Sequence, residues 1–143
     1  MESINYKAAR YKEHAVDLIA YAFIALFIYT AYSKIITFES FNYVLGQSPL
    51  LENFSHTIAW LIPAVEINIS ILLIVPLTRR FGLYAALVLM ILFTTYLIYM
   101  VLSGSKLPCS CGGVISIMSW QQHIWFNIGF IFLALTGIIY FKE

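Results

Sequence analysis

Two cysteines separated by a single residue are the part of this sequence with the most recognisable chemistry. They lie in the segment Pro108-Cys109-Ser110-Cys111-Gly112-Gly113, and the chain has no other cysteine. Two thiols at this spacing, between proline and glycine residues that favour a tight turn, can alternate between a dithiol and a small strained disulfide. Because strain raises the reduction potential of such a bond and makes it labile, the pair suits thiol–disulfide exchange.

The same pair of cysteines permits two other interpretations. Thiolates bind soft metals such as Cu(I) or zinc, and Met118 and His123 follow a short distance downstream. A tetrahedral structural site needs more ligands in fixed positions than this segment offers, so we expect no metal site. The two cysteines could also form a static staple, or remain two ordinary thiols. Of the three interpretations, we favour redox exchange.

Three polar or amphipathic residues open the apolar segment that follows the cysteines. Trp120, His123 and Asn127 are spaced by three and four residues, so they share one face of a helix. Polar groups on one face of a membrane helix should face the interior of the protein. There His123 could donate a proton to a leaving thiolate or assist an attacking thiol. It could equally do no more than hydrogen-bond a neighbouring helix.

Glu66 is the most costly residue of the chain, because it lies in the middle of an apolar segment. A carboxyl group in that position must either hold a proton or pair with a cation, and the long side chain of Lys34 is the obvious cation. Counted inward from the outer boundary, Glu66, Asn127 and the pair Thr94-Thr95 lie about seven residues deep, or about 10 Å. The sequence therefore predicts a buried polar layer beneath the cysteines, acting as structural glue or as a proton relay.

The composition of the chain predicts the kind of fold that holds these residues. Hydrophobic residues make up 62% of the chain and charged residues only 10%, outside the usual range of soluble proteins. Four nearly uncharged segments are long enough to cross about 30 Å of hydrocarbon, and they run approximately over 16–33, 57–75, 81–102 and 120–141. Lipid offers the backbone no hydrogen-bond partner, and four short segments cannot close a barrel. We therefore predict an all-α membrane protein, a four-transmembrane-helix bundle forming a single domain over 1–143.

The lysines and arginines predict the orientation of this bundle. Two of them, Lys34 and Lys106, fall on one side, and six fall on the other: Lys7, Arg10, Lys12, Arg79, Arg80 and Lys142. Because short cytoplasmic loops are enriched in basic residues, we expect both termini in the cytoplasm. The loops 34–56 and 103–119 would then face the periplasm from a bacterial inner membrane. Disulfides form and persist in that compartment.

Local signals support the segment boundaries and exclude some alternatives. Pro76 follows the second segment, and Ser119 with Gln122 has the form of a capping box opening the fourth. The first segment is longer than a signal-peptide core and is followed by Ser33-Lys34-Ile35-Ile36, without a small-x-small cleavage pattern, so we expect no cleavage there. No basic block exists that could hold a nucleic-acid backbone, so we expect no such partner.

These residues together resemble a known family. Ser33-Lys34 closing the first segment, Pro63-Ala64-Val65-Glu66 inside the second, and a Cys-x-Cys-x-Gly motif after the third resemble the MauE/DoxX family of redox-associated membrane proteins. The motif followed by Trp120, His123, Phe126 and Asn127 is similar in particular to the small MauE-like, methylamine-utilisation type. Two positions depart from the pattern. Gly112 stands where many relatives carry an aromatic residue, and Ala31 stands where a glycine often occurs.

The resemblance implies a role in disulfide formation or thiol transfer during the maturation of exported proteins. It places the exchange at Cys109 and Cys111 and implies a periplasmic thioredoxin-like or other cysteine-containing client. Glu66 and His123 would support proton movement. Asn127, together with Trp120 and Lys34, would form the neighbourhood of a quinone or of a proton relay.

The cysteine count limits this expectation. Four-helix thiol oxidoreductases that pass electrons to quinone generally use two cysteine pairs, whereas this chain has one. Either one pair performs both tasks, or a partner supplies the second. The alternative function is a non-catalytic subunit of a membrane complex that binds or stabilises a partner protein. The sequence leaves open whether the chain is an enzyme.

Overall fold

The computed structural model describes residues 1–104 and 118–142, and every regular element in these ranges is helical. The helices are α1 (Glu2–Ile36), α2 (Phe38–Gly46), the short 3-10 helix η1 (Glu52–Phe54), α3 (Ser55–Ile74), α4 (Arg79–Leu102) and α5 (Trp120–Lys142). The helices α1, α3, α4 and α5 are each long and apolar enough to cross a membrane. The predicted fold class, an all-α protein with four transmembrane helices, is therefore confirmed.

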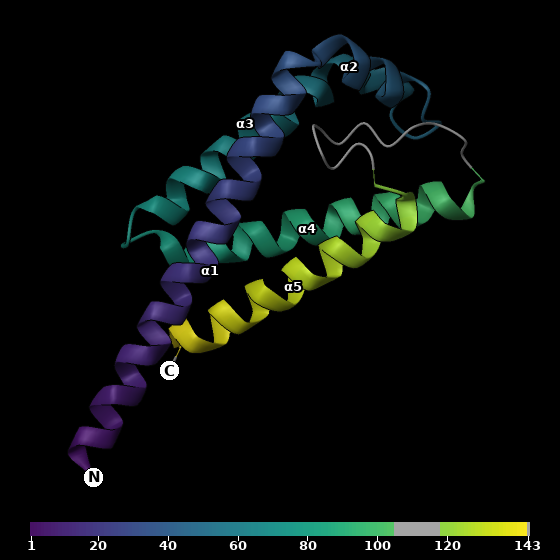
Figure 1. Cartoon of the computed structure of the whole chain (residues 1–143). Helices are drawn as coiled ribbons and strands as arrows, with labels where there is room; N and C mark the ends of the chain where they lie inside the picture. The colour runs from purple at the N-terminus through teal and green to yellow at the C-terminus, as the bar shows by residue number, and fades with distance from the viewer. Residues whose placement is uncertain (105–117, 143) are drawn as a thin grey trace.

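The four long helices pack around a shared interior. Helix α1 packs along α3 and α5, and α4 also packs along α3 and α5, so each long helix has two principal neighbours. In Figure 1, α4 and α5 run side by side, while α2 lies at the end of the bundle where α1 ends and α3 begins. The ends of α4 and α5 that flank the cysteine segment are Leu102 and Trp120.

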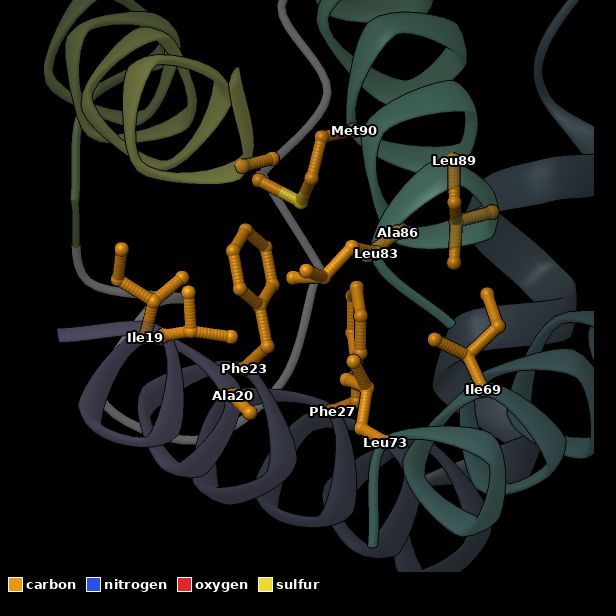
Figure 2. Packing of buried hydrophobic residues seen from close by; sticks show 12 residues of the cluster. Ile19, Ala20, Phe23, Phe27, Ile69, Leu73, Leu83, Ala86, Leu89 and Met90 are labelled. Carbon is orange, nitrogen blue, oxygen red and sulfur yellow. The ribbon is translucent and has the colours of Figure 1, made fainter. Parts of the chain in front are cut away.

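The apolar core lies between these four helices. Figure 2 shows side chains from α1, α3 and α4 meeting there, among them Phe23, Phe27, Leu73 and Leu83, all essentially inaccessible to solvent. Phe130 of α5 joins them, with its ring centroid 5.1 Å from that of Phe23 in an edge-to-face arrangement. Many large apolar side chains point outward instead, as expected where lipid replaces water around the bundle.

Helix α1 extends well beyond the predicted span 16–33. Its 35 residues correspond to about 52 Å at the helical rise, against about 30 Å of hydrocarbon. In Figure 1 its N-terminal part projects away from the other helices. Hydropathy detects only the part of a helix that crosses lipid, whereas the helix itself continues because the residues before Val16 include good helix formers such as Ala8, Ala9 and Glu13.

The predicted loop 34–56 contains a helix that hydropathy did not reveal. Helix α2 has nine residues, too few to stand out in a search for membrane-spanning segments. Phe41 and Leu45 of α2 are buried against Ala59 of α3, with Phe38 partly buried beside them. This spacing of three and four residues is the signal of an amphipathic helix, and it was present in the sequence.

The helix ends follow the local sequence signals. Val75 has extended backbone angles before Pro76, as expected for the residue that precedes a proline. The capping box is also confirmed: the Ser119 amide donates to Gln122 Oε1 at 3.1 Å, and the Gln122 amide donates to Ser119 Oγ at 3.2 Å. At the start of α4, Arg79 forms an ion pair with Asp17 of α1.

Candidate functional site

A buried ion pair between α1 and α3 is the centre of the candidate site. Lys34 Nζ donates a hydrogen bond to Glu66 Oε1 at 2.8 Å, and the two side chains are only 5% and 1% exposed. The sequence left two alternatives for Glu66, a bound proton or a cation, and the structure supplies the cation. Attraction between opposite charges is strong at this depth, and it offsets part of the cost of removing both charges from water.

Helical spacing accounts for the inward position of Glu66. On α3, the buried residues Ala59, Pro63, Glu66, Ser70 and Leu73 follow one another at intervals of three or four. They therefore form a single stripe along the helix, which faces the interior of the bundle. Glu66 lies in the middle of that stripe, at a position where an apolar residue would be expected.

Aromatic rings complete the surroundings of Lys34. Its Nζ atom lies 5.8 Å from the ring centroid of Phe41 on α2 and 5.7 Å from that of Phe93 on α4. Both distances are within the range of cation–π attraction, which supplies part of the stabilisation that an ammonium group loses when it leaves water. Thr30, one turn before Lys34, lies beside the Glu66 carboxylate. Its hydroxyl donates to the Phe27 carbonyl oxygen at 3.3 Å.

Helix α5 contributes two polar side chains to the same interior. His123 is 6% exposed and Asn127, one turn further along, is 3% exposed. The amide nitrogen of Asn127, Nδ2, has no hydrogen-bond partner among the described residues, and neither has the second carboxylate oxygen of Glu66, Oε2. Buried polar atoms are rarely left without a partner, so each of these two atoms calls for an explanation.

A cavity of about 440 Å³ joins these groups. Its walls are mainly apolar and come from α1, α2, α3, α4 and α5, and from Leu51 between α2 and η1. The polar residues that line it are Thr30, Lys34, Glu66, Tyr96, His123 and Asn127. The arrangement offers hydrogen-bond donors and acceptors inside an apolar chamber, next to an ion pair whose net charge is zero.

The structure brings together four of the residues singled out from the sequence. The same cavity is lined by residues from three helices: Lys34 of α1, Glu66 of α3, and His123 and Asn127 of α5. Trp120 is partly buried and does not line it.

The pair Thr94-Thr95 does not belong to the polar layer predicted from depth. The Thr94 hydroxyl donates to the Met90 carbonyl oxygen at 2.7 Å, and the Thr95 hydroxyl donates to the Ile91 carbonyl oxygen at 2.8 Å. Neither threonine lines the cavity. A hydroxyl on a membrane helix can bond to its own helix, so depth alone does not decide whether it faces a polar partner.

Cys109 and Cys111 lie outside the described residues. Within residues 1–104 and 118–142, no three His, Cys, Asp or Glu side chains are grouped as metal ligands would be.

Sequence reasoning missed several residues around the ion pair. Phe41 and Phe93 gave no signal, because aromatic residues are frequent throughout the chain. Thr30 could have been found, since it lies four residues before Lys34 and so on the same face of α1. Tyr96 gave no such signal among the other aromatic residues near the ends of the segments.

Comparison with known proteins identifies the family. No curated protein and no solved structure matches this chain. The family described as methylamine utilisation protein MauE matches residues 12–140, a range that covers most of the chain and includes the buried ion pair and the cysteine motif. The chain therefore belongs to the MauE family, as the resemblance in its motifs predicted.

Proposed function

We propose that this protein is a membrane-embedded thiol–disulfide redox component that exchanges electrons with exported client proteins through Cys109 and Cys111. The observation that carries the proposal is the position of the only cysteine pair. It lies in the segment between α4 and α5, and His123 and Asn127, within two turns of the start of α5, line the mainly apolar cavity. The family description connects the chain with methylamine utilisation, and we propose that the client is an exported, cysteine-containing protein of that process.

The exchange that we propose transfers two electrons. A thiolate of the client attacks one sulfur of the Cys109–Cys111 disulfide and forms a mixed disulfide. The second client thiolate then attacks the client sulfur of that mixed disulfide and releases the cysteine of this protein. The client gains a disulfide, while Cys109 and Cys111 become thiols and take up two protons. A short disulfide of this spacing suits the role of oxidant, because strain makes it easier to reduce.

The orientation required by this function is part of the proposal. The excess of lysine and arginine near both termini and near Arg79 favours a cytoplasmic location for that side. The cysteine segment then faces the periplasm of a bacterial inner membrane, where client proteins and disulfides occur together.

A thiol-trapping titration tests the proposal directly. Purified protein is equilibrated in glutathione buffers of graded potential, trapped with a maleimide reagent, and the 109–111 peptide is weighed by mass spectrometry. We expect the peptide to pass from a form that carries two maleimide groups to an unlabelled disulfide form, which is two hydrogens lighter than the free dithiol. Cysteines that remain reduced at every potential would overturn the proposal.

Matched variants separate this function from that of a non-catalytic subunit. In Cys109→Ser and Cys111→Ser we expect client oxidation to be lost while association with the partner is retained. Ser110→Ala is the control, because it changes the same segment without removing a thiol. Lost association with undisturbed client oxidation would favour a structural subunit, and stoichiometric copper or zinc in anaerobically purified protein would favour metal handling.

A further inference from the structure

The cavity between the helices has the properties of a binding site for a small amphipathic molecule. Its volume of about 440 Å³ lies within the range of about 300–1,000 Å³ of sites that hold small organic ligands. Most of its lining is aliphatic or aromatic, including Val65, Met90 and Phe126, and its polar groups are few. This combination fits a ligand with a long apolar part and a compact polar head.

Two buried atoms of the cavity lining have no partner among the described residues, and they define what the head must offer. Asn127 Nδ2 is a hydrogen-bond donor and requires an acceptor, whereas Glu66 Oε2 is an acceptor and requires a donor. Both residues line the cavity, and both are more than nine-tenths buried. A head group that both accepts and donates hydrogen bonds would satisfy them.

The charge of the site restricts the head further. Lys34 is already bound to Glu66 Oε1, so the ion pair contributes no net charge to the cavity. A phosphate or carboxylate head would need a further cation, because a buried charge without a partner is strongly unfavourable. Among the described residues, no other lysine or arginine lines the cavity. An uncharged head therefore fits this lining, in which Lys34 is already paired, better than the head of a phospholipid or a fatty acid.

We propose that this cavity binds an isoprenoid quinone and its quinol, an inference that rests on the proposed redox function of the cysteines. A quinol hydroxyl can donate to Glu66 Oε2 and accept from Asn127 Nδ2, whereas a quinone carbonyl can only accept. The apolar walls accommodate the part of the molecule that is soluble in the membrane. Because the quinol satisfies both buried atoms and the quinone only one, the site binds the quinol more tightly.

A bound quinone supplies the oxidant that the thiol exchange requires. When Cys109 and Cys111 form their disulfide, they release two electrons and two protons. The quinone takes up the same two electrons and two protons and becomes the quinol. One cysteine pair can then perform both tasks. Its dithiol form passes electrons to the quinone, and its disulfide form accepts electrons from the client.

Binding of decylubiquinone and decylubiquinol to the purified full-length protein in detergent tests the inference. We expect saturable binding, tighter for the quinol, and roughly tenfold weaker quinol binding in Asn127→Leu, which removes the unpaired donor. Val65→Phe should also weaken binding, because it fills part of the cavity and leaves the polar groups in place. Thr94→Val is the control, since Thr94 is buried but bonds to its own helix outside the cavity.

Circular dichroism melting of each variant verifies that a change in binding does not reflect unfolding. Equal affinity in the unaltered protein, Asn127→Leu and Val65→Phe would overturn the inference. So would competition by 1-decanol as effective as that of the quinol, which would indicate a site for neutral amphiphiles without a redox head.

The two proposals fail separately, because the glutathione titration contains no quinone. A cysteine pair that cycles in that titration, combined with absent quinone binding, refutes the quinone site and leaves the thiol exchange standing. A quinone that binds beside cysteines that never oxidise refutes the thiol exchange, and with it the electron transfer proposed here.

Discussion

At the scale of single residues, the buried Lys34–Glu66 pair determines much of the character of the site. Two charges that were 32 positions apart in the chain meet at 2.8 Å in an apolar interior. Each charge compensates the other, so the pair is tolerated although its formation required the removal of both groups from water. The aromatic rings of Phe41 and Phe93 lie within cation–π distance of the ammonium group.

Removal of one member of this pair should cost more stability than removal of both. We expect Lys34→Met to lower the free energy of unfolding by about 3–5 kcal/mol, because Glu66 is then buried without its cation. The double variant Lys34→Met with Glu66→Leu should recover most of that loss, since no uncompensated charge remains. Thermal unfolding of the detergent-solubilised proteins by circular dichroism measures both. A double variant no more stable than Lys34→Met would contradict this explanation.

At the scale of helices, close approach of α3 to α4 holds the bundle together next to the turn that connects them. A Cβ atom added to Gly82 of α4 would lie 2.9 Å from Leu73 Cδ2 and 3.0 Å from the Leu73 backbone nitrogen. Small residues at such contacts allow membrane helices to pack closely, since van der Waals contact replaces the hydrophobic effect between them. Arg79 strengthens the same region, donating from Nε to the Leu73 carbonyl oxygen at 3.0 Å.

Gly82→Ala should therefore destabilise the bundle by about 1–3 kcal/mol, because the added methyl group meets backbone atoms that cannot move aside easily. Gly129→Ala on α5 is the matched control. A Cβ atom there has no neighbour within 4 Å, and alanine favours a helix over glycine by up to about 1 kcal/mol. Melting temperatures of the two variants in the same detergent compare them. The explanation fails if both substitutions shift the melting temperature equally.

At the scale of the whole molecule, four membrane-spanning helices place the two ends of the bundle in different environments. The turn between α3 and α4 lies at one end, together with Leu77, and the segment around η1 lies at the other, together with Asn53. Both residues are exposed, so each can carry a reporter. Because the number of spans is even, the N- and C-terminal ends fall on the same side.

The proposed orientation can be measured with these reporters. In a background with Cys109→Ser and Cys111→Ser, we expect Asn53→Cys to react with a membrane-impermeant maleimide in intact cells. Leu77→Cys should react only after the membrane is permeabilised, because basic residues favour the cytoplasm for that side. The reverse labelling pattern would place the cysteine segment in the cytoplasm and would remove the basis for a periplasmic client.

Sequence alone was enough to predict the membrane class, the four spans, the capping box of α5 and the family. These features depend on local composition or on neighbours within a few positions, which a single chain displays directly. It also suggested Lys34 as the partner of Glu66, because Lys34 and Lys106 are the only lysines or arginines that the sequence places on the side of the membrane with the cysteines. The short helix α2 was overlooked, although its apolar residues have helical spacing.

Which polar residues share a site could be seen only in the folded bundle. Thr94 and Asn127 lie at similar depth by counting, yet Asn127 lines the cavity and Thr94 bonds to its own helix. Depth along a helix follows from sequence position, but the direction in which a side chain faces depends on the rotation of each helix against its neighbours. That rotation is set by the packing of many apolar side chains at once. For the same reason, the cavity and its two unpaired buried atoms became visible only in the folded bundle.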